Sequence, residues 1–212
     1  MTQAPRIYVL AGVNGAGKST IGGAAFRAFG ADYYNPDEAA RELRTANPGL
    51  SLPEANSAAW HQGKRLLERA IAQRLDFALE TTLGASSIPR LLAAAASQGI
   101  EIHMWYIGLA NAELHLERVR ARVRQGGHDI AEADIRRRYE HSRLNLIDLL
   151  PKVAALRMFD NSAQADPARG KAPTPLLVLH MERGKIIAPV DLSRTPAWAK
   201  PIAGAALALE AR

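Results

Sequence analysis

The sequence contains no cysteine among its 212 residues, so it can form neither a disulfide framework nor a metal site built on thiolates. A reducing setting fits this composition, and we expect a cytoplasmic protein. No uninterrupted apolar stretch approaches the ~18 residues that suggest a membrane-spanning helix. The apolar run IYVLAG near the N-terminus is too brief for the core of a signal peptide. We therefore expect no membrane partner.

Acidic residues are in deficit, because 27 lysines and arginines face 21 acids and leave a net charge of +6. Such a balance invites a nucleic-acid interpretation. The segment from Arg118 to Arg143, however, holds eight arginines against four acids and carries four of the six charges. A compact cluster of arginines suits a polyphosphate as well as it suits DNA. Nucleic acid is therefore an alternative rather than the expected partner.

Apolar runs alternate with helical patterns along the chain. We expect strands at residues 6–11, 31–35, 76–82, 100–109 and 156–161. Helices are expected at 18–29, from Pro36 with Asn35 as its cap, at 52–75 with Ser51 and Glu54 as a capping box, at 88–97, and on both sides of GGHDIAEAD. A β-hairpin with ERGK as its turn and an Ala-rich helix from about Thr195 should follow.

This alternation predicts an α/β fold with a roughly five-stranded, mostly parallel sheet and helices on both faces. The C-terminal hairpin and helix would be added to it. We expect a single domain over residues 1–212, with a core at 6–162, a lid at about 118–143 and a C-terminal extension at 163–212.

The octapeptide GVNGAGKS, Gly12 to Ser19, matches the complete phosphate-loop pattern and stands between an expected strand and an expected helix. Its glycines permit a tight turn whose N–H groups point at phosphate oxygens. Lys18 would reach the β- and γ-phosphates, and the Ser19 hydroxyl would help to hold Mg²⁺. ATP and Mg²⁺ are the expected cofactors. The predicted nucleotide-binding residues are Gly12, Asn14, Gly15, Ala16, Gly17, Lys18, Ser19 and Thr20.

Other phosphate-loop classes lack support in this chain. It has no N-K-x-D guanine motif, no D-x-x-G switch, no L-S-G-G-Q signature and no apolar strand ending in the Asp-Glu pair of a processive ATPase. Carboxylates and arginines instead follow the expected strands, where ligands of open α/β sheets bind. This pattern favours a small kinase of the P-loop kinase fold over a motor or a switch.

Two carboxylates could contact the molecule that accepts the phosphoryl group. Asp37 lies 19 residues after Lys18 and could take the proton of an acceptor hydroxyl during phosphoryl transfer; it could equally only favour a helix N-terminus. Glu80 ends the apolar strand FALE and could bind Mg²⁺ through water or hold a sugar hydroxyl. We predict Asp37, Glu80, Thr81 and Thr82 as substrate-binding residues.

The arginines form pairs at helical spacing around a glycine-rich break. Arg118 and Arg122 share one face of a helix. The break GGHDI and three further arginines follow them, as in a lid that neutralises transferring phosphate charge when it closes. We predict at least one arginine to act on phosphate, with Arg118 and Arg122 as catalytic candidates and with His128, Arg136 and Arg137 as candidates in the lid.

Five segments together resemble the zeta toxin family of P-loop kinases: LAGVNGAGKST, YYNPDEAARELR, FALETTL, LERVRARVRQGGHDIAEADIRRRYEHSRLNL and FDNS. The resemblance spans residues 6 to about 162. It implies an adenylate- or shikimate-kinase-like core. It also implies ATP- and Mg²⁺-dependent phosphorylation of the 3′-hydroxyl of the amino sugar in UDP-N-acetylglucosamine, and an antitoxin as a protein partner.

The resemblance also assigns roles to residues. Lys18 and Ser19 match the family's phosphate-loop residues, Asp37 its catalytic base and Glu80 the carboxylate that engages the sugar nucleotide. Arg118 matches the first of two arginines that contact the phosphates. The second aligns near His128, so Arg122 or one of the arginines at 136–138 would replace it. A nucleoside or polynucleotide kinase and a nucleotide-dependent binding module without turnover are the alternative interpretations.

Overall fold

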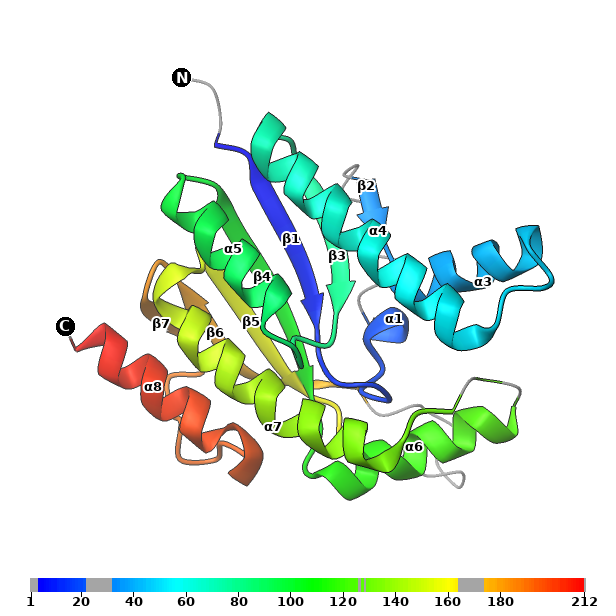
Figure 1. The fold of residues 1–212 in the computed structure, drawn as a ribbon. Helices are drawn as coiled ribbons and strands as arrows, with labels where there is room; N and C mark the ends of the chain where they lie inside the picture. The colour runs from blue at the N-terminus through cyan, green and yellow to red at the C-terminus, as the bar shows by residue number, and fades with distance from the viewer. Residues whose placement is uncertain (1–3, 22–31, 126, 128, 164–173, 212) are drawn as a thin grey trace.

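The structure, a computed structural model, describes residues 4–21, 32–125, 127, 129–163 and 174–211. Within these residues the chain forms one seven-stranded sheet in the order β2-β3-β1-β4-β5-β6-β7 (Figure 1). Neighbouring strands are parallel from β2 to β5 and antiparallel from β5 to β7. The strands are β1 (Arg6–Ala11), β2 (Asp32–Tyr34), β3 (Phe77–Thr81), β4 (Glu101–Gly108), β5 (Ala155–Asp160), β6 (Leu176–Glu182) and β7 (Lys185–Ala188).

The number of strands is larger than the roughly five predicted, because the C-terminal hairpin joins the sheet. The hairpin itself is confirmed, with Arg183 and Gly184 at φ values of 48° and 80° in its turn, as the tightest hairpin turns require. Strand β6 pairs with β5 and places Leu179 and Met181 in the core. A detached hairpin would leave those side chains in water and the edge of β5 unpaired.

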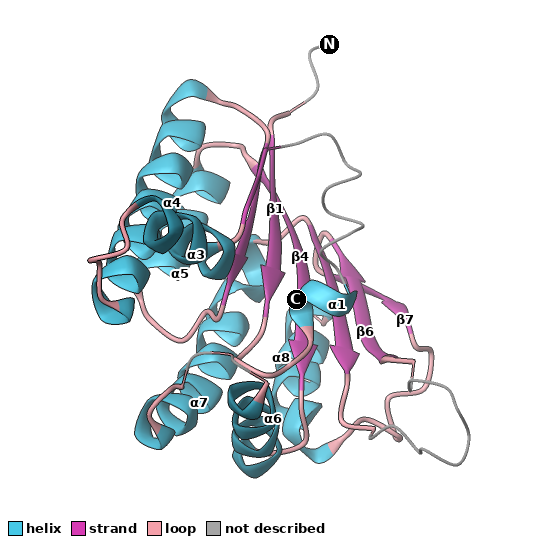
Figure 2. Cartoon of the chain, turned by 90° about the vertical axis from the view of Figure 1, so that its right-hand side faces the viewer, coloured by secondary structure: helices cyan, strands magenta, loops and turns pink. Residues whose placement is uncertain are grey.

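The helices cover both faces of the sheet, as predicted (Figure 2). Buried side chains of α4, α5, α7 and α8 share one cluster with the first face, whereas Ile21 of α1 and Leu114 of α6 pack against the second. None of the described helices is long and apolar enough to cross a membrane. The helices are α1 (Lys18–Ile21), α3 (Pro36–Ala46), α4 (Leu52–Gln73), α5 (Ser87–Ser97), α6 (Ala112–Arg124), α7 (Glu132–Leu149) and α8 (Lys200–Glu210), with short 3₁₀ turns at Leu150–Lys152 and Ala197–Ala199.

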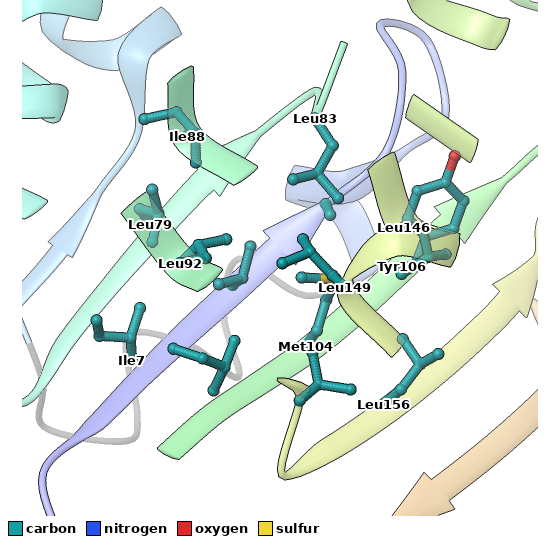
Figure 3. Packing of buried hydrophobic residues seen from close by; sticks show 14 of the residues in the cluster. Ile7, Leu79, Leu83, Ile88, Leu92, Met104, Tyr106, Leu146, Leu149 and Leu156 are labelled. Carbon is teal, nitrogen blue, oxygen red and sulfur yellow. The ribbon is translucent and has the colours of Figure 1, made fainter. Parts of the chain in front are cut away.

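The main core follows from the alternation of side chains along the strands. Ile7 of β1 and Met104 of β4 point to the same face, where they meet Leu92 of α5 and Leu149 of α7 (Figure 3). Each such buried side chain stabilises the fold by about 1.5–3 kcal/mol. This packing holds the carboxyl ends of the parallel strands in fixed positions.

Two helix starts follow the capping signals of the sequence. The Asn35 side chain accepts a hydrogen bond of 2.9 Å from the Asp37 backbone N–H, and Pro36 opens α3. Ser51 and Glu54 form the predicted capping box at the start of α4. The caps fix where α3 and α4 begin, and both beginnings lie near the carboxyl edge of the sheet (Figure 1).

Candidate active site

The phosphate loop connects β1 to α1 and has the backbone that its glycines permit. Gly12, Gly15 and Gly17 have φ values of 142°, 81° and 87°, which side chains other than hydrogen disfavour. A Cβ atom on Gly12 would lie 2.3 Å from the carbonyl oxygen of Ile107. The loop therefore depends on glycine both for its conformation and for its contact with β4.

Three side chains from distant elements brace this loop. His115 of α6 lies 2.8 Å from the Asn14 carbonyl oxygen, and Asn161 after β5 donates to the Ala16 carbonyl over 2.8 Å. Arg138 of α7 donates to the Asn14 side-chain oxygen over 2.8 Å. Burial lowers the pKa of His115 to about 4. The ring is therefore neutral near pH 7, with Nδ1–H as the donor because a carbonyl can only accept.

Lys18 and Glu80 form a buried ion pair at the end of the loop. The Lys18 Nζ atom lies 3.5 Å from Glu80 Oε1, and each side chain is 8% exposed. The second oxygen of Glu80 accepts from the Tyr33 hydroxyl at 3.0 Å and from Asn35 Nδ2 at 3.4 Å. Glu80 is paired with Leu10 of β1 in the sheet register. Its carboxylate therefore lies close to the start of the phosphate loop, which follows β1.

Asp37 lies in the first turn of α3, with its carboxylate partly exposed. Arg122 of α6 approaches it, with Nη1 at 3.9 Å from Asp37 Oδ2. A side chain of α6 therefore reaches the predicted catalytic base.

A cavity of about 610 Å³ joins these groups. It brings together six of the predicted nucleotide- and substrate-binding residues: Asn14, Lys18, Asp37, Glu80, Thr81 and Thr82. The two threonines hold the loop after β3, because their hydroxyls accept from the N–H groups of Leu83 and Gly84 at 3.1 and 3.3 Å. Ile130 and Ala131, which lie between α6 and α7, and Asp134 in the first turn of α7 also line the cavity.

Arg118 does not line this cavity. Its guanidinium donates to the carbonyl oxygens of Asn161 and Ala163 at 2.8 and 3.3 Å. Burial lowers its pKa, while Glu117 and Asp160 act in the opposite direction. Arg118 lies beside the phosphate loop, since a Cβ on Gly15 would lie 3.3 Å from Arg118 Cβ. Its position is therefore on the β5 side of the loop.

The three consecutive arginines of α7 have different surroundings. Arg136 pairs with Glu113 at 2.6 Å and with Glu132 at 2.8 Å, outside the cavity. Arg137 lines the cavity and pairs with Asp134 at 2.8 Å. Arg138 lines the cavity and is the member that reaches the phosphate loop. The third lid candidate, His128, and the side chains of Ser19 and Thr20 lie outside the described part of the structure.

The sequence predictions did not single out Arg138 and did not include Trp60. Helical periodicity points to Arg138, because it lies three residues after Ile135 and four before Ser142, both fully buried. Gly84 allows its approach, since a Cβ there would lie 2.6 Å from Arg138 Cγ. Trp60 lines the cavity and is 36% exposed. No local pattern in the sequence distinguishes it from a core tryptophan.

The fold and the loop define a nucleotide-binding domain of the P-loop, kinase-like class. Residues 7–142 match the AAA_33 family, which is described as an AAA domain. The chain belongs to this family. An uncharacterized protein of Haemophilus influenzae is 36% identical over 132 residues, which are 60% of this chain and 88% of that protein.

Solved structures share the fold at low sequence identity. A chain of the AvrRxo1-ORF1:AvrRxo1-ORF2 complex with sulphate superposes with a TM-score of 0.63 and 14% identity, over 89% of this chain and 61% of that one. The same complex with ATP gives a TM-score of 0.62 and 12% identity, over 97% and 80%. A chain of the PezAT toxin–antitoxin system of Streptococcus pneumoniae gives 0.55 and 17%, over 75% and 68%. This chain thus spans about three fifths of the first structure's length.

Proposed function

We propose that the protein is an ATP- and Mg²⁺-dependent small-molecule kinase that transfers the γ-phosphoryl group to a sugar hydroxyl of a nucleotide sugar such as UDP-N-acetylglucosamine. The observation that carries this proposal is the convergence of Lys18, Asp37 and Glu80 on one cavity. A phosphate-binding cation, a candidate base and a buried carboxylate are the groups that phosphoryl transfer to an alcohol requires.

In the reaction, the acceptor oxygen forms a bond to the γ-phosphorus while the bond from that phosphorus to the β–γ bridging oxygen breaks. Asp37 takes the proton that the hydroxyl loses. Its carboxylate lines the cavity from the first turn of α3 and is partly exposed, so it is accessible to an acceptor. A base in this position contributes about 10²- to 10⁴-fold to the rate.

Cationic groups balance the charge on the transferring phosphoryl group. Lys18 lies at the end of the phosphate loop, where it would contact the β- and γ-phosphates. Arg138 enters from α7 and already donates to Asn14 of that loop. We assign Arg138, rather than Arg136, as the lid-side arginine, because Arg136 is held by two carboxylates outside the cavity.

The residues present fit a magnesium ion that is held mainly by phosphate oxygens and water. Among the described residues, no group of three or more His, Asp or Glu side chains is arranged to hold a metal by itself. Mg²⁺ in kinases commonly uses one or two carboxylates together with substrate phosphates. Glu80 beside Lys18 would supply such a carboxylate, and the bound ion would neutralise charge on the nucleotide phosphates.

The decisive experiment is incubation with labelled ATP, Mg²⁺ and UDP-N-acetylglucosamine, with other nucleotide sugars in parallel. We expect a phosphorylated nucleotide sugar, and we expect Asp37→Asn to lower kcat by about 10²-fold or more. Glu38→Gln is the matched control, because Glu38 is the next residue of α3 and does not line the cavity. If none of the nucleotide sugars accepts phosphate, the proposed acceptor is wrong.

The polynucleotide-kinase alternative draws its support from the basic segment, and much of that charge is paired. Arg120 contacts Glu132, Arg137 contacts Asp134, and Arg143 contacts Glu140. These pairs leave fewer cations for a nucleic-acid backbone than the sequence count suggests. Weak and salt-insensitive binding of oligonucleotides is therefore expected, whereas a steep salt dependence would favour the alternative.

We further propose that a separately encoded antitoxin controls this activity. The two structural neighbours support this idea, because one was solved as AvrRxo1-ORF1 with AvrRxo1-ORF2 and the other is described as part of a toxin–antitoxin system. Expression of the wild-type protein alone should then slow growth and Asp37→Asn should not. Equal growth of the two strains would argue against a toxin.

A further inference from the structure

The outer wall of the cavity is one face of α4. Leu52, Asn56 and Trp60 follow each other at intervals of four residues, and Pro53 and Ser57 stand beside them; all five line the cavity. Residues four apart on a helix lie one above the other. This face therefore forms a continuous strip along the cavity, which Ile130 and Arg137 also line.

Trp60 is the largest side chain of the strip. It is 36% exposed and is not a member of the buried core. The His61 ring meets it in a T-shaped contact with 4.9 Å between ring centroids. A large aromatic surface that lines a cavity and stays accessible to solvent is typical of a ligand-binding wall.

The helix that carries Trp60 is fixed to the sheet at this level. The Tyr34 hydroxyl donates to the Ala59 carbonyl over 2.6 Å. The ring of Tyr34 also packs on Gly63, where a Cβ would lie 2.5 Å from Tyr34 Cε1. Burial raises the pKa of Tyr34. The platform around Trp60 is thus held by β2, next to the strand end that carries Asn35 and leads to Asp37.

The size of the cavity suggests an acceptor with two parts. Its volume of about 610 Å³ lies within the range of about 300–1,000 Å³ that suits drug-sized ligands. A single sugar ring beside Asp37 would fill only part of this space. The rest extends along the strip of α4.

We propose that Trp60 and Asn56 form a subsite for a nucleobase attached to the sugar that is phosphorylated. The indole stacks on the flat face of the base, and the Asn56 amide, which offers both donors and an acceptor, bonds to its polar edge. The Asn56 amide lies one helical turn from the Trp60 ring. The pair is therefore suited to a nucleobase, which has both a flat face and a polar edge. This inference rests on the proposed kinase function for the identity of the sugar, but the base subsite can be tested without catalysis.

Binding of uridine tests the subsite directly. In the presence of a saturating non-hydrolysable ATP analogue, uridine should quench tryptophan fluorescence in the wild type and in Trp105→Phe, but not in Trp60→Phe. Trp105 is a suitable control because it contacts Tyr8 and Arg157 and does not line the cavity. Absence of the Trp60-dependent quench would overturn the subsite, as would equal quenching by N-acetylglucosamine, which has no base.

Steady-state kinetics tests its role in the reaction. With UDP-N-acetylglucosamine as acceptor, Trp60→Ala should raise the acceptor KM by about 5- to 150-fold while kcat changes by less than about twofold. Trp60→Phe should retain most of the affinity, and Asn56→Ala should raise KM as well. An unchanged KM in Trp60→Ala would refute the subsite and leave the kinase function intact. A quench by uridine without turnover of any nucleotide sugar would refute the kinase function and leave the subsite.

Discussion

The ammonium group of Lys18 and the carboxylate of Glu80 form an ion pair at 3.5 Å, with 8% of each side chain exposed. One comes from the phosphate loop and the other from the end of the neighbouring strand β3. The Tyr33 hydroxyl and the Asn35 amide also bond to the carboxylate. The phosphate loop and the end of β3, which both line the cavity, are therefore linked through a buried ion pair.

Removing one member of this pair should destabilise the protein strongly. Without nucleotide, Lys18→Met should lower the free energy of unfolding by about 3–5 kcal/mol, because it leaves the Glu80 charge buried without its partner. Glu80→Gln should do the same to Lys18. The double variant should be less destabilised than the sum of the two single variants. Urea denaturation measures all three.

The exposed pair of Lys64 and Glu68 on α4 is the matched control for these variants. Its atoms are closer, at 2.6 Å, but the side chains are 33% and 41% exposed. Exposed pairs of this kind contribute about 0.2–1 kcal/mol. If Lys64→Met cost as much as Lys18→Met, burial would not be the source of the effect.

Arg138 and Arg136 should differ sharply in catalysis. Arg138→Ala should lower kcat by about 10²-fold, since it removes a cation that borders the phosphate loop. Arg136→Ala should leave kcat within about twofold, because its partners Glu113 and Glu132 lie outside the cavity. The measurement is kcat at saturating ATP and acceptor, with circular dichroism to confirm folding.

A second variant separates the position of Arg138 from its charge. Gly84→Ala keeps the arginine but places a Cβ 2.6 Å from its Cγ and 3.0 Å from its Cα, so α7 must move. We expect a loss of kcat with an unchanged net charge and little change in ATP affinity. Full activity in Gly84→Ala would show that the close approach of α7 is not needed.

His115 should make stability depend on pH. Burial lowers its pKa from 6.5 to about 4 in the folded protein, so between these values the unfolded chain binds a proton that the folded chain does not. Stability therefore rises with pH across this window and falls by about 3 kcal/mol as the pH drops through it. Urea denaturation at several pH values from 4 to 7 measures this slope.

The variant His115→Asn isolates this contribution. Asparagine keeps an N–H that can donate to the Asn14 carbonyl but does not titrate. The free energy of unfolding of this variant should rise less steeply with pH than that of the wild type between pH 4 and 6.5. Carboxyls with lowered pKa values, such as that of Glu101 beside His103, remain in both proteins and cancel in the comparison. Identical slopes would mean that His115 is not the titrating group.

Most of the local structure could be predicted from short-range patterns. Asn35 and Ser51 cap the helices that their neighbours predict, and the glycines of the phosphate loop have the positive φ values that the motif requires. These features depend on residues within a few positions of one another. The same holds for the ERGK turn between β6 and β7.

The strand number could not be predicted in this way, because it depends on which edge the hairpin meets. The apolar residues Leu179 and Met181 indicate a strand in the sequence, but they do not indicate that this strand pairs with β5. The arginines of α7 present the same problem. Arg136, Arg137 and Arg138 are identical neighbours in the sequence, and a rotation of about 100° per residue around the helix sends them to different surroundings.

The sequence by itself determined the phosphate loop, the helix caps, the α/β alternation and the two carboxylates at strand or helix ends. Each of these features depends only on residues that are close together in the sequence. Only the tertiary structure decided that Lys18 and Glu80 form a buried pair, that Arg138 rather than Arg136 reaches the loop, and that Trp60 lines the cavity. These relationships join residues up to 124 positions apart. They arise from how β-strand order and helix packing bring distant segments together.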